Sequence, residues 1–198
     1  MTETHWKKVV AMKASDLLEP DVLNASALEL LEPGMRPEAY IQALTQAEKW
    51  PEAVKVMARA LPAREAVWWA CVCTRQMESD ANQEETEALE AAEQWVYKPN
   101  EDNRQKAFRI MQDSNSDSAA SLCASAAVVS AGNLPIEKDQ HVEIDKQVFP
   151  TIIESIILVS ASEKSGMELL DRLRLSLISG KDIACGGNGR VDSNGEDQ

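Results

Sequence analysis

The sequence contains few residues of the kinds that build disulfide frameworks, metal centres and glycine-rich cofactor loops. Its 198 residues include four cysteines, two histidines and eight glycines, and its aromatic side chains are five Trp, two Tyr and two Phe. Four cysteines in a chain of this length are too sparse for a small disulfide-stapled protein. We therefore expect reduced thiols and a core built mainly from Ala, Leu, Val, Ile and Met.

The cysteine spacing does not favour a metal site. Cys71 and Cys73 form a C-x-C pair with no second pair to complete a ligand set, and residues two apart on a helix point about 200° apart. The sequence therefore predicts no metal and no cofactor. The segments SGKD and CGGNGR do not match a phosphate-binding loop. The sequence also contains no recognisable motif that pairs a nucleophile with a base. We therefore expect no catalytic residues and no enzyme.

Positive charge and long apolar runs are also scarce. Twenty basic residues against 33 acidic ones give a net charge of −13, which disfavours nucleic acid and anionic membranes as partners. The most apolar run, TIIESIILVSA, is interrupted by Glu154 and is too short to cross a bilayer. Because no signal-peptide pattern opens the chain, we expect a cytoplasmic protein. The acidity suits a basic protein partner, although solubility alone also explains it.

What is present is helical periodicity. Three segments open with a proline followed shortly by Glu-Ala, at Pro37, Pro51 and Pro62, as is typical of a helix's first turn. We predict an all-α fold: one helical domain over residues 1–180, with about eight helices around a central helix at 62–77, as an irregular bundle or solenoid-like array. Residues 1–35 are less regular, and the glycine-rich, acidic segment 181–198 is predicted to be a disordered tail.

The predicted central helix contains the most unusual segment of the sequence, PAREAVWWACVCTRQ. Its apolar residues cover every direction of a helical wheel, as expected of a helix surrounded by others. We therefore place Trp68, Trp69 and Cys71 in the structural core, together with Trp95 on the apolar stripe of a helix at about 83–97. If either adjacent tryptophan is exposed, it would instead be an anchor for a partner.

Two surfaces are candidates for partner binding. From Glu78 to Asp102 there are nine acidic residues and one lysine, a local net of −8, and we single out Glu84, Glu87 and Glu90 on the predicted helix. The other candidate is a long polar connection at 133–147, which contains His141. The alternative for the acidic helix is an ordinary solvated face.

The text ALELLEPGMRPEAYIQAL, followed by ALPAREAVWWACVC and the W-V-x-x-P segment after Gln94, resembles a bacterial helical family of unknown function with an LPxREAVWWAC motif. The resemblance covers residues 26–180. Members of that family often lie near type VI secretion genes, which implies an accessory role: a cytoplasmic adaptor or chaperone for a secreted effector or spike protein. Two alternatives stay open, an immunity protein that neutralises a toxin and an enzyme with an unrecognised site. The oligomeric state is left open.

Overall fold

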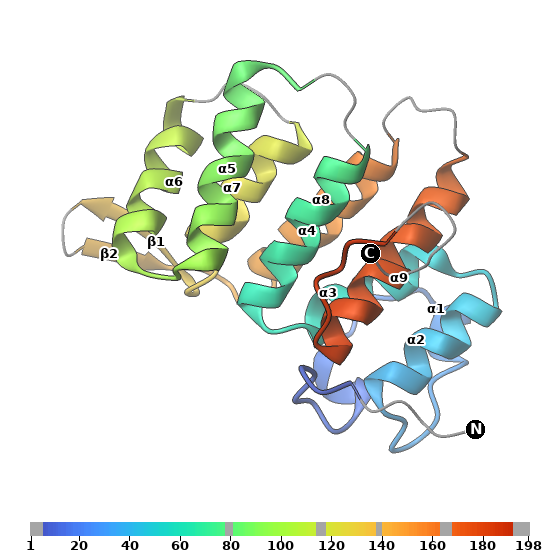
Figure 1. Ribbon diagram of the computed structural model, residues 1–198. Coiled ribbons are helices and arrows are strands. Elements are labelled where there is room, and N and C mark those ends of the chain that lie inside the picture. The colour runs from blue at the N-terminus through green and yellow to red at the C-terminus, as the bar shows by residue number, and fades with distance from the viewer. Residues whose placement is uncertain (1–5, 78–80, 114–117, 138–139, 163–167, 192–198) are drawn as a thin grey trace. The chain divides into compact units, whose positions relative to one another are not determined.

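The computed structural model describes residues 6–77, 81–113, 118–137, 140–162 and 168–191 (Figure 1). Over these residues the chain is predominantly α-helical, with one short pair of antiparallel strands. The predicted all-α fold class is therefore confirmed. Chain contacts form two compact units, one made of Met1–Pro62 with Met167–Gln198 and the other of Ala63–Gly166. The sequence predicts a single domain instead. An apolar stripe shows which face of a helix is buried, but it does not show which other helices pack against that face.

The first unit is built around α3. Its described residues form a 3-10 helix and four α-helices: η1 (Ala14–Leu17), α1 (Ala25–Leu28), α2 (Pro37–Gln46), α3 (Trp50–Ala60) and α9 (Leu169–Cys185). As predicted, α2 and α3 each carry a proline in the first turn. Helix α3 packs against η1, α2 and α9, and the buried Tyr40 hydroxyl donates a 2.8 Å hydrogen bond to the Ala27 carbonyl. These contacts join the irregular N-terminal segment to the helices.

The end of α9 differs from the sequence prediction. The helical domain does not stop at residue 180, because Gly180 is buried within α9, which continues to Cys185 and is capped by Gly186 with a φ of 103°. The Asp182 carboxylate then accepts a 2.8 Å hydrogen bond from the Gly189 amide. The predicted disordered tail is thus wrong for 181–191, because the side chain of Asp182 supplies a partner for the glycine loop. Residues 192–198 lie outside the described residues.

The second unit holds the remaining elements. They are α4 (Ala63–Met77), α5 (Gln83–Tyr97), α6 (Glu101–Asp113), α7 (Ala119–Val129), β1 (Asn133–Glu137), β2 (Gln140–Glu143) and α8 (Val148–Ser162). Helix α7 contacts α4, α5, α6, α8 and β1, whereas α4 packs against α5, α7 and α8. The small-residue helix α7, rather than the tryptophan-rich helix, therefore occupies the centre of this unit. Its Ala and Ser side chains let the neighbouring backbones come close on every side.

The polar connection after α7 is not a plain loop. Strands β1 and β2 pair antiparallel, with Leu134 opposite Val142 and Asn133 opposite Glu143. A buried arginine of α6 fixes the start of this hairpin, because the Arg104 guanidinium donates to the carbonyl oxygens of Val128 and Asn133 at 2.7 and 2.9 Å. The sequence prediction missed the strands since their alternation is short and weakly apolar.

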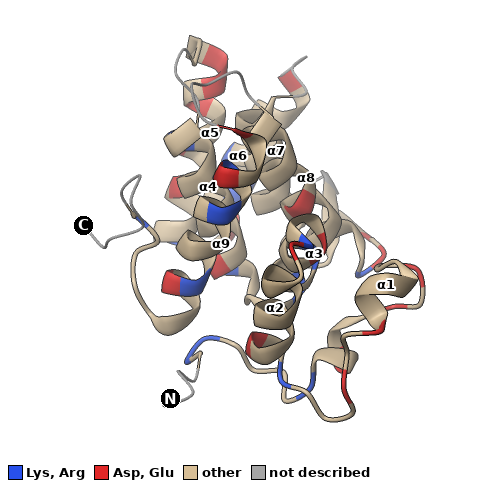
Figure 2. Ribbon diagram, turned by 90° about the vertical axis from the view of Figure 1, so that its right-hand side faces the viewer, with Lys and Arg blue, Asp and Glu red and all other residues tan. Residues whose placement is uncertain are grey.

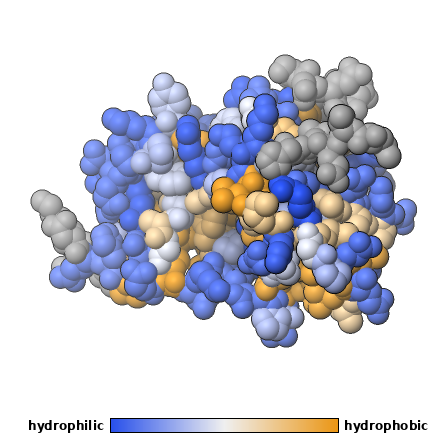
Figure 3. Space-filling model, turned by 90° about the horizontal axis from the view of Figure 1, so that it is seen from below, coloured by the Kyte–Doolittle hydropathy of each residue, from blue (hydrophilic) through white to orange (hydrophobic). Residues whose placement is uncertain are grey.

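Large apolar side chains are exposed at scattered positions. They are Val10, Met12, Leu28, Tyr97, Val142, Val148, Leu169 and Leu170. On the face shown in Figure 3, apolar clusters (orange) are likewise interrupted by hydrophilic surface (blue). Within the described part of the chain, no helix combines the length and apolar character needed to cross a bilayer. Charge, more than a single apolar patch, therefore distinguishes the surface.

Candidate partner-binding surface

The start of α5 is fixed by its N-cap residue, Asn82. The Asn82 side chain accepts a 3.0 Å hydrogen bond from the Glu85 amide, and the Glu85 carboxylate accepts one from the Asn82 amide in return. This capping box satisfies two amides that a helix start would leave unpaired. One side of α5 is buried and consists of Ala88, Leu89, Ala91, Ala92, Trp95 and Val96. The opposite side is therefore turned to solvent.

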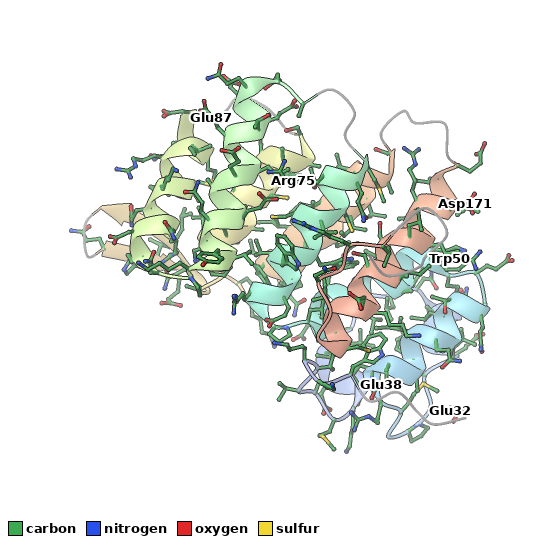
Figure 4. The ribbon with its side chains drawn as sticks, viewed as in Figure 1. Glu32, Glu38, Trp50, Arg75, Glu87 and Asp171 are labelled. Atoms are coloured by element: carbon green, nitrogen blue, oxygen red, sulfur yellow. The ribbon has the colours of Figure 1, made fainter. Side chains whose placement is uncertain are left out.

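Of the three glutamates predicted to bind a partner, Glu87 and Glu90 lie away from the buried side, whereas Glu84 lies in the first turn on the face of Ala88. Glu84, Glu87 and Glu90 are exposed, and Figure 2 shows acidic residues (red) gathered toward the first half of α5. Figure 4 marks Glu87 near the start of α5. Within the surface, the Gln83 amide donates a 2.9 Å hydrogen bond to the Glu87 carboxylate. The spacing of three residues brings the carboxylates close enough for their negative potentials to add.

A salt bridge borders these glutamates. Arg75 of α4 donates to both carboxylate oxygens of Glu93, with N–O distances of 2.5 and 2.7 Å, and Figure 4 places Arg75 between α4 and α5. These hydrogen bonds are the main reason that the pKa of Arg75 is raised above its ordinary value. The paired geometry neutralises Glu93 and fixes α5 against α4.

The second half of α5 forms one wall of a shallow hollow of about 360 Å³. Its lining residues come from α5 and the start of α6: Glu90, Glu93, Gln94, Tyr97, Lys98 and Asn103. Tyr97 is the most exposed large apolar side chain among the described residues, at 86%. The Asn103 amide spans the turn, donating to the carbonyl oxygens of Gln94 and Lys98. In this hollow the aromatic ring of Tyr97 therefore lies beside the carboxylates of Glu90 and Glu93.

We define the α5 surface as Glu84, Glu87, Glu90 and Tyr97 with the hollow between α5 and α6. Sequence reasoning named the three glutamates but missed Tyr97 and the salt bridge of Arg75 with Glu93. His141, the fourth predicted site residue, is exposed on β2 opposite Pro135. In Figure 1 the first half of α5 and the hairpin lie at different ends of this unit. The structure therefore does not join His141 to the acidic residues in one site.

The residues assigned to the core lie mostly in buried positions. Trp69 and Cys71 are fully buried and Trp95 is 8% exposed, whereas Trp68 is half-buried. Cys71 and Cys73 are both enclosed in α4. A hydrogen bond with the Cys123 thiol, followed by burial, raises the pKa of Cys71 well above its ordinary value. That shift keeps Cys71 protonated and weakens it as a nucleophile or metal ligand.

Thr74 extends this buried polar group, with its hydroxyl 3.5 Å from the Cys123 sulfur and 3.2 Å from the Ser160 hydroxyl. Each polar atom of the group thus has a partner inside the helices, as a packed interior requires. Among the described residues, no three His, Cys, Asp or Glu side chains gather in a way that could hold a metal ion.

The model of a family of unknown function, DUF6931, matches residues 40–184. The chain belongs to this family. The DUF6931 match begins at Tyr40 in α2, covers all of the second unit and ends at Ala184 in α9. It therefore includes the α5 surface, and it leaves out η1, α1 and the glycine loop after α9. No curated protein and no solved structure matches the chain.

Proposed function

We propose that this member of DUF6931 is a non-enzymatic binding protein that acts as a cytoplasmic adaptor or chaperone accessory to type VI secretion, with a secreted effector or spike protein as its partner. The observation that carries the binding role is the α5 surface. It combines exposed carboxylates with a highly exposed tyrosine at the edge of a hollow. The link to secretion rests on the resemblance of the LPxREAVWWAC text to a family whose members often lie near those genes.

The charge of the α5 surface defines the chemistry of the partner. Nine acidic residues and one lysine lie between Glu78 and Asp102, so like charges repel one another across a short stretch of chain. A partner that brings lysines or arginines relieves this repulsion and is attracted over roughly 8 Å at physiological salt. We therefore expect a basic protein segment, bound faster at low ionic strength than at high ionic strength.

Tyr97 gives the α5 surface an apolar contact as well as charge. A tyrosine ring buries a large area at a low cost in conformational entropy, and its hydroxyl can still hydrogen-bond at the rim of an interface. The adjoining hollow of about 360 Å³ has room for a side chain of the partner. Charge then guides the approach, and the ring and the hollow supply specificity.

The test is affinity purification from the native host with mass spectrometry, using two variants of equal charge. In the first, Glu84, Glu87 and Glu90 are each changed to Lys. In the second, three exposed acids outside α5, Asp21, Glu29 and Glu32, are changed to Lys. We expect the wild type and the second variant to retain a type VI secretion component that the first variant loses. Equal retention by both variants would contradict the role of the α5 surface.

The same purification separates the alternatives. An adaptor or chaperone retains an effector or spike component and leaves toxicity unchanged when it is expressed with the effector. An immunity protein instead rescues cells from one toxin. If purification enriches nothing related to secretion, the proposed accessory role fails, whatever the α5 variants do.

A further inference from the structure

The glycine loop that follows α9 contains an asparagine joined directly to a glycine, Asn188 and Gly189. In such a pair the main-chain nitrogen of the glycine can attack the side-chain amide carbon of the asparagine, because the glycine has no Cβ to hinder the approach. The attack releases ammonia and closes a five-membered succinimide ring. Its rate depends on how the reacting atoms and the groups that assist them are positioned. Asn188 is exposed to the water that later opens the ring.

The fold holds the attacking residue in one position. Gly189 has a φ of 74°, a conformation that L side chains rarely adopt, and a Cβ at this position would lie 2.6 Å from Cδ1 of Ile183. Its carbonyl oxygen accepts a hydrogen bond from the Ser179 hydroxyl. Packing on α9 therefore explains why this residue is a glycine, and it also gives the Gly189 nitrogen a defined place.

A carboxylate of α9 contacts that nitrogen. Asp182 accepts a 2.8 Å hydrogen bond from the Gly189 amide through Oδ2. A main-chain amide is a very weak acid, so its nitrogen becomes an effective nucleophile only as its proton is removed. A base within hydrogen-bonding reach of that proton assists the removal. Asp182 thus occupies the position of a general base for the attack.

A second hydrogen bond contacts the carbonyl group that is attacked. The Arg190 amide donates to Oδ1 of Asn188 at 2.8 Å, which folds the asparagine side chain toward the main chain that follows it. Negative charge develops on this oxygen when the carbonyl carbon becomes tetrahedral, and a fixed N–H donor stabilises that charge. One base and one donor therefore contact the two groups that react.

We propose that Asn188 is a self-catalysed deamidation site, with Asp182 as the base and the Arg190 amide as the donor to the oxyanion. The Gly189 nitrogen forms a bond with Cγ of Asn188 and gives its proton to Asp182. The bond from Cγ to Nδ2 then breaks, and Nδ2 takes that proton and leaves as ammonia. Water opens the succinimide to aspartate or isoaspartate, which leaves a new negative charge in the loop. This inference is independent of the proposed secretion role.

The test is the rate at which the full chain deamidates, measured by tryptic peptide mapping with mass spectrometry. Trypsin releases Asn188 in the peptide 182–190 and the other Asn-Gly pair, at Asn194, in the peptide 191–198. Because a positioned base contributes roughly 10²–10⁴-fold, we expect Asn188 to deamidate at least about tenfold faster in folded protein than in the same chain unfolded by guanidinium chloride at the same pH.

Two variants separate the base from the packing of the loop. Asp182→Asn keeps an oxygen that can accept the hydrogen bond but removes the base, so it should abolish most of the acceleration; fragment masses distinguish position 182 from position 188. Ser179→Ala is the matched control, because it removes a loop contact that does not involve the base, and it should retain the acceleration. Circular dichroism confirms that both variants are folded.

Three outcomes would overturn the proposal. Equal rates in the folded and unfolded wild type would show that the fold does not assist the reaction, a conclusion that holds even if a variant does not fold. An acceleration that persists in Asp182→Asn would exclude Asp182 as the base. Equal loss of the acceleration in Asp182→Asn and Ser179→Ala would assign it to the packing of the loop on α9 instead.

Discussion

Replacing Trp69 by Ala tests whether α4 is held by a fully buried indole. Trp69 is 0% exposed, so the change removes a side chain that buries about 200 Å² and leaves a cavity. At about 25 cal/mol per Å² the lost burial amounts to about 5 kcal/mol. Buried aromatic-to-alanine changes generally cost about 3–5 kcal/mol. We therefore expect a loss of about 4 kcal/mol in the free energy of unfolding.

The neighbouring tryptophan is the matched control. Trp68 is half-buried, so Trp68→Ala should cost roughly half as much, about 2 kcal/mol. The assay is urea unfolding followed by far-ultraviolet circular dichroism, with the slope m shared between variants so that the midpoint reports stability. A loss below about 1 kcal/mol for Trp69→Ala, or a larger loss for Trp68→Ala than for Trp69→Ala, would refute the packing described for α4.

Two further predictions concern buried polar groups of the second unit. Arg104→Met should cost about 3 kcal/mol in unfolding free energy, because it removes the donor from the buried carbonyl oxygen of Val128 and from the part-buried one of Asn133; a change within about 0.5 kcal/mol would contradict this. The pKa of Cys71 is raised in the folded chain, so the folded state holds this proton more tightly. That contribution is complete below the ordinary thiol pKa of 9.0 and is lost as pH rises above it. Unfolding free energy should therefore fall more steeply above pH 9 in the wild type than in Cys71→Ala, and equal slopes would contradict the assignment.

The helices were predictable because their apolar residues recur with helical spacing, and because α2 and α3 carry a proline in the first turn. Helix α5 shows the extent of this reasoning: the stripe through Ala88 and Trp95 predicts which side is buried. The same wheel places Tyr97 nine residues after Ala88, about 180° away, so its exposure could have been read from the sequence. The exposed fraction of Tyr97 and the hollow beside it depend on the position of α6. Neither could be predicted from the sequence.

The sequence could not predict which elements of the fold pack against one another. The central position of α7 follows from five elements that pack on a helix of small residues, and composition shows only that close packing is possible. Arg172 lies between Asp171 and Leu173 in a segment whose sequence is typical of an amphipathic helix. Its burial arises from tertiary packing that helical periodicity does not specify. The hairpin was missed for a similar reason, since short polar strands are identified mainly by their pairing.

The most direct test of the account is the affinity of the captured partner for the α5 surface. The dissociation constant would be measured by calorimetry at two salt concentrations, for the wild type and for the two charge-matched triple Lys variants. We predict that Lys at 84, 87 and 90 weakens binding at least about tenfold and removes most of its salt dependence. Lys at 21, 29 and 32 should leave both nearly unchanged. Equal weakening by the two variants would show that net charge, and not the α5 surface, governs binding, and would contradict the account.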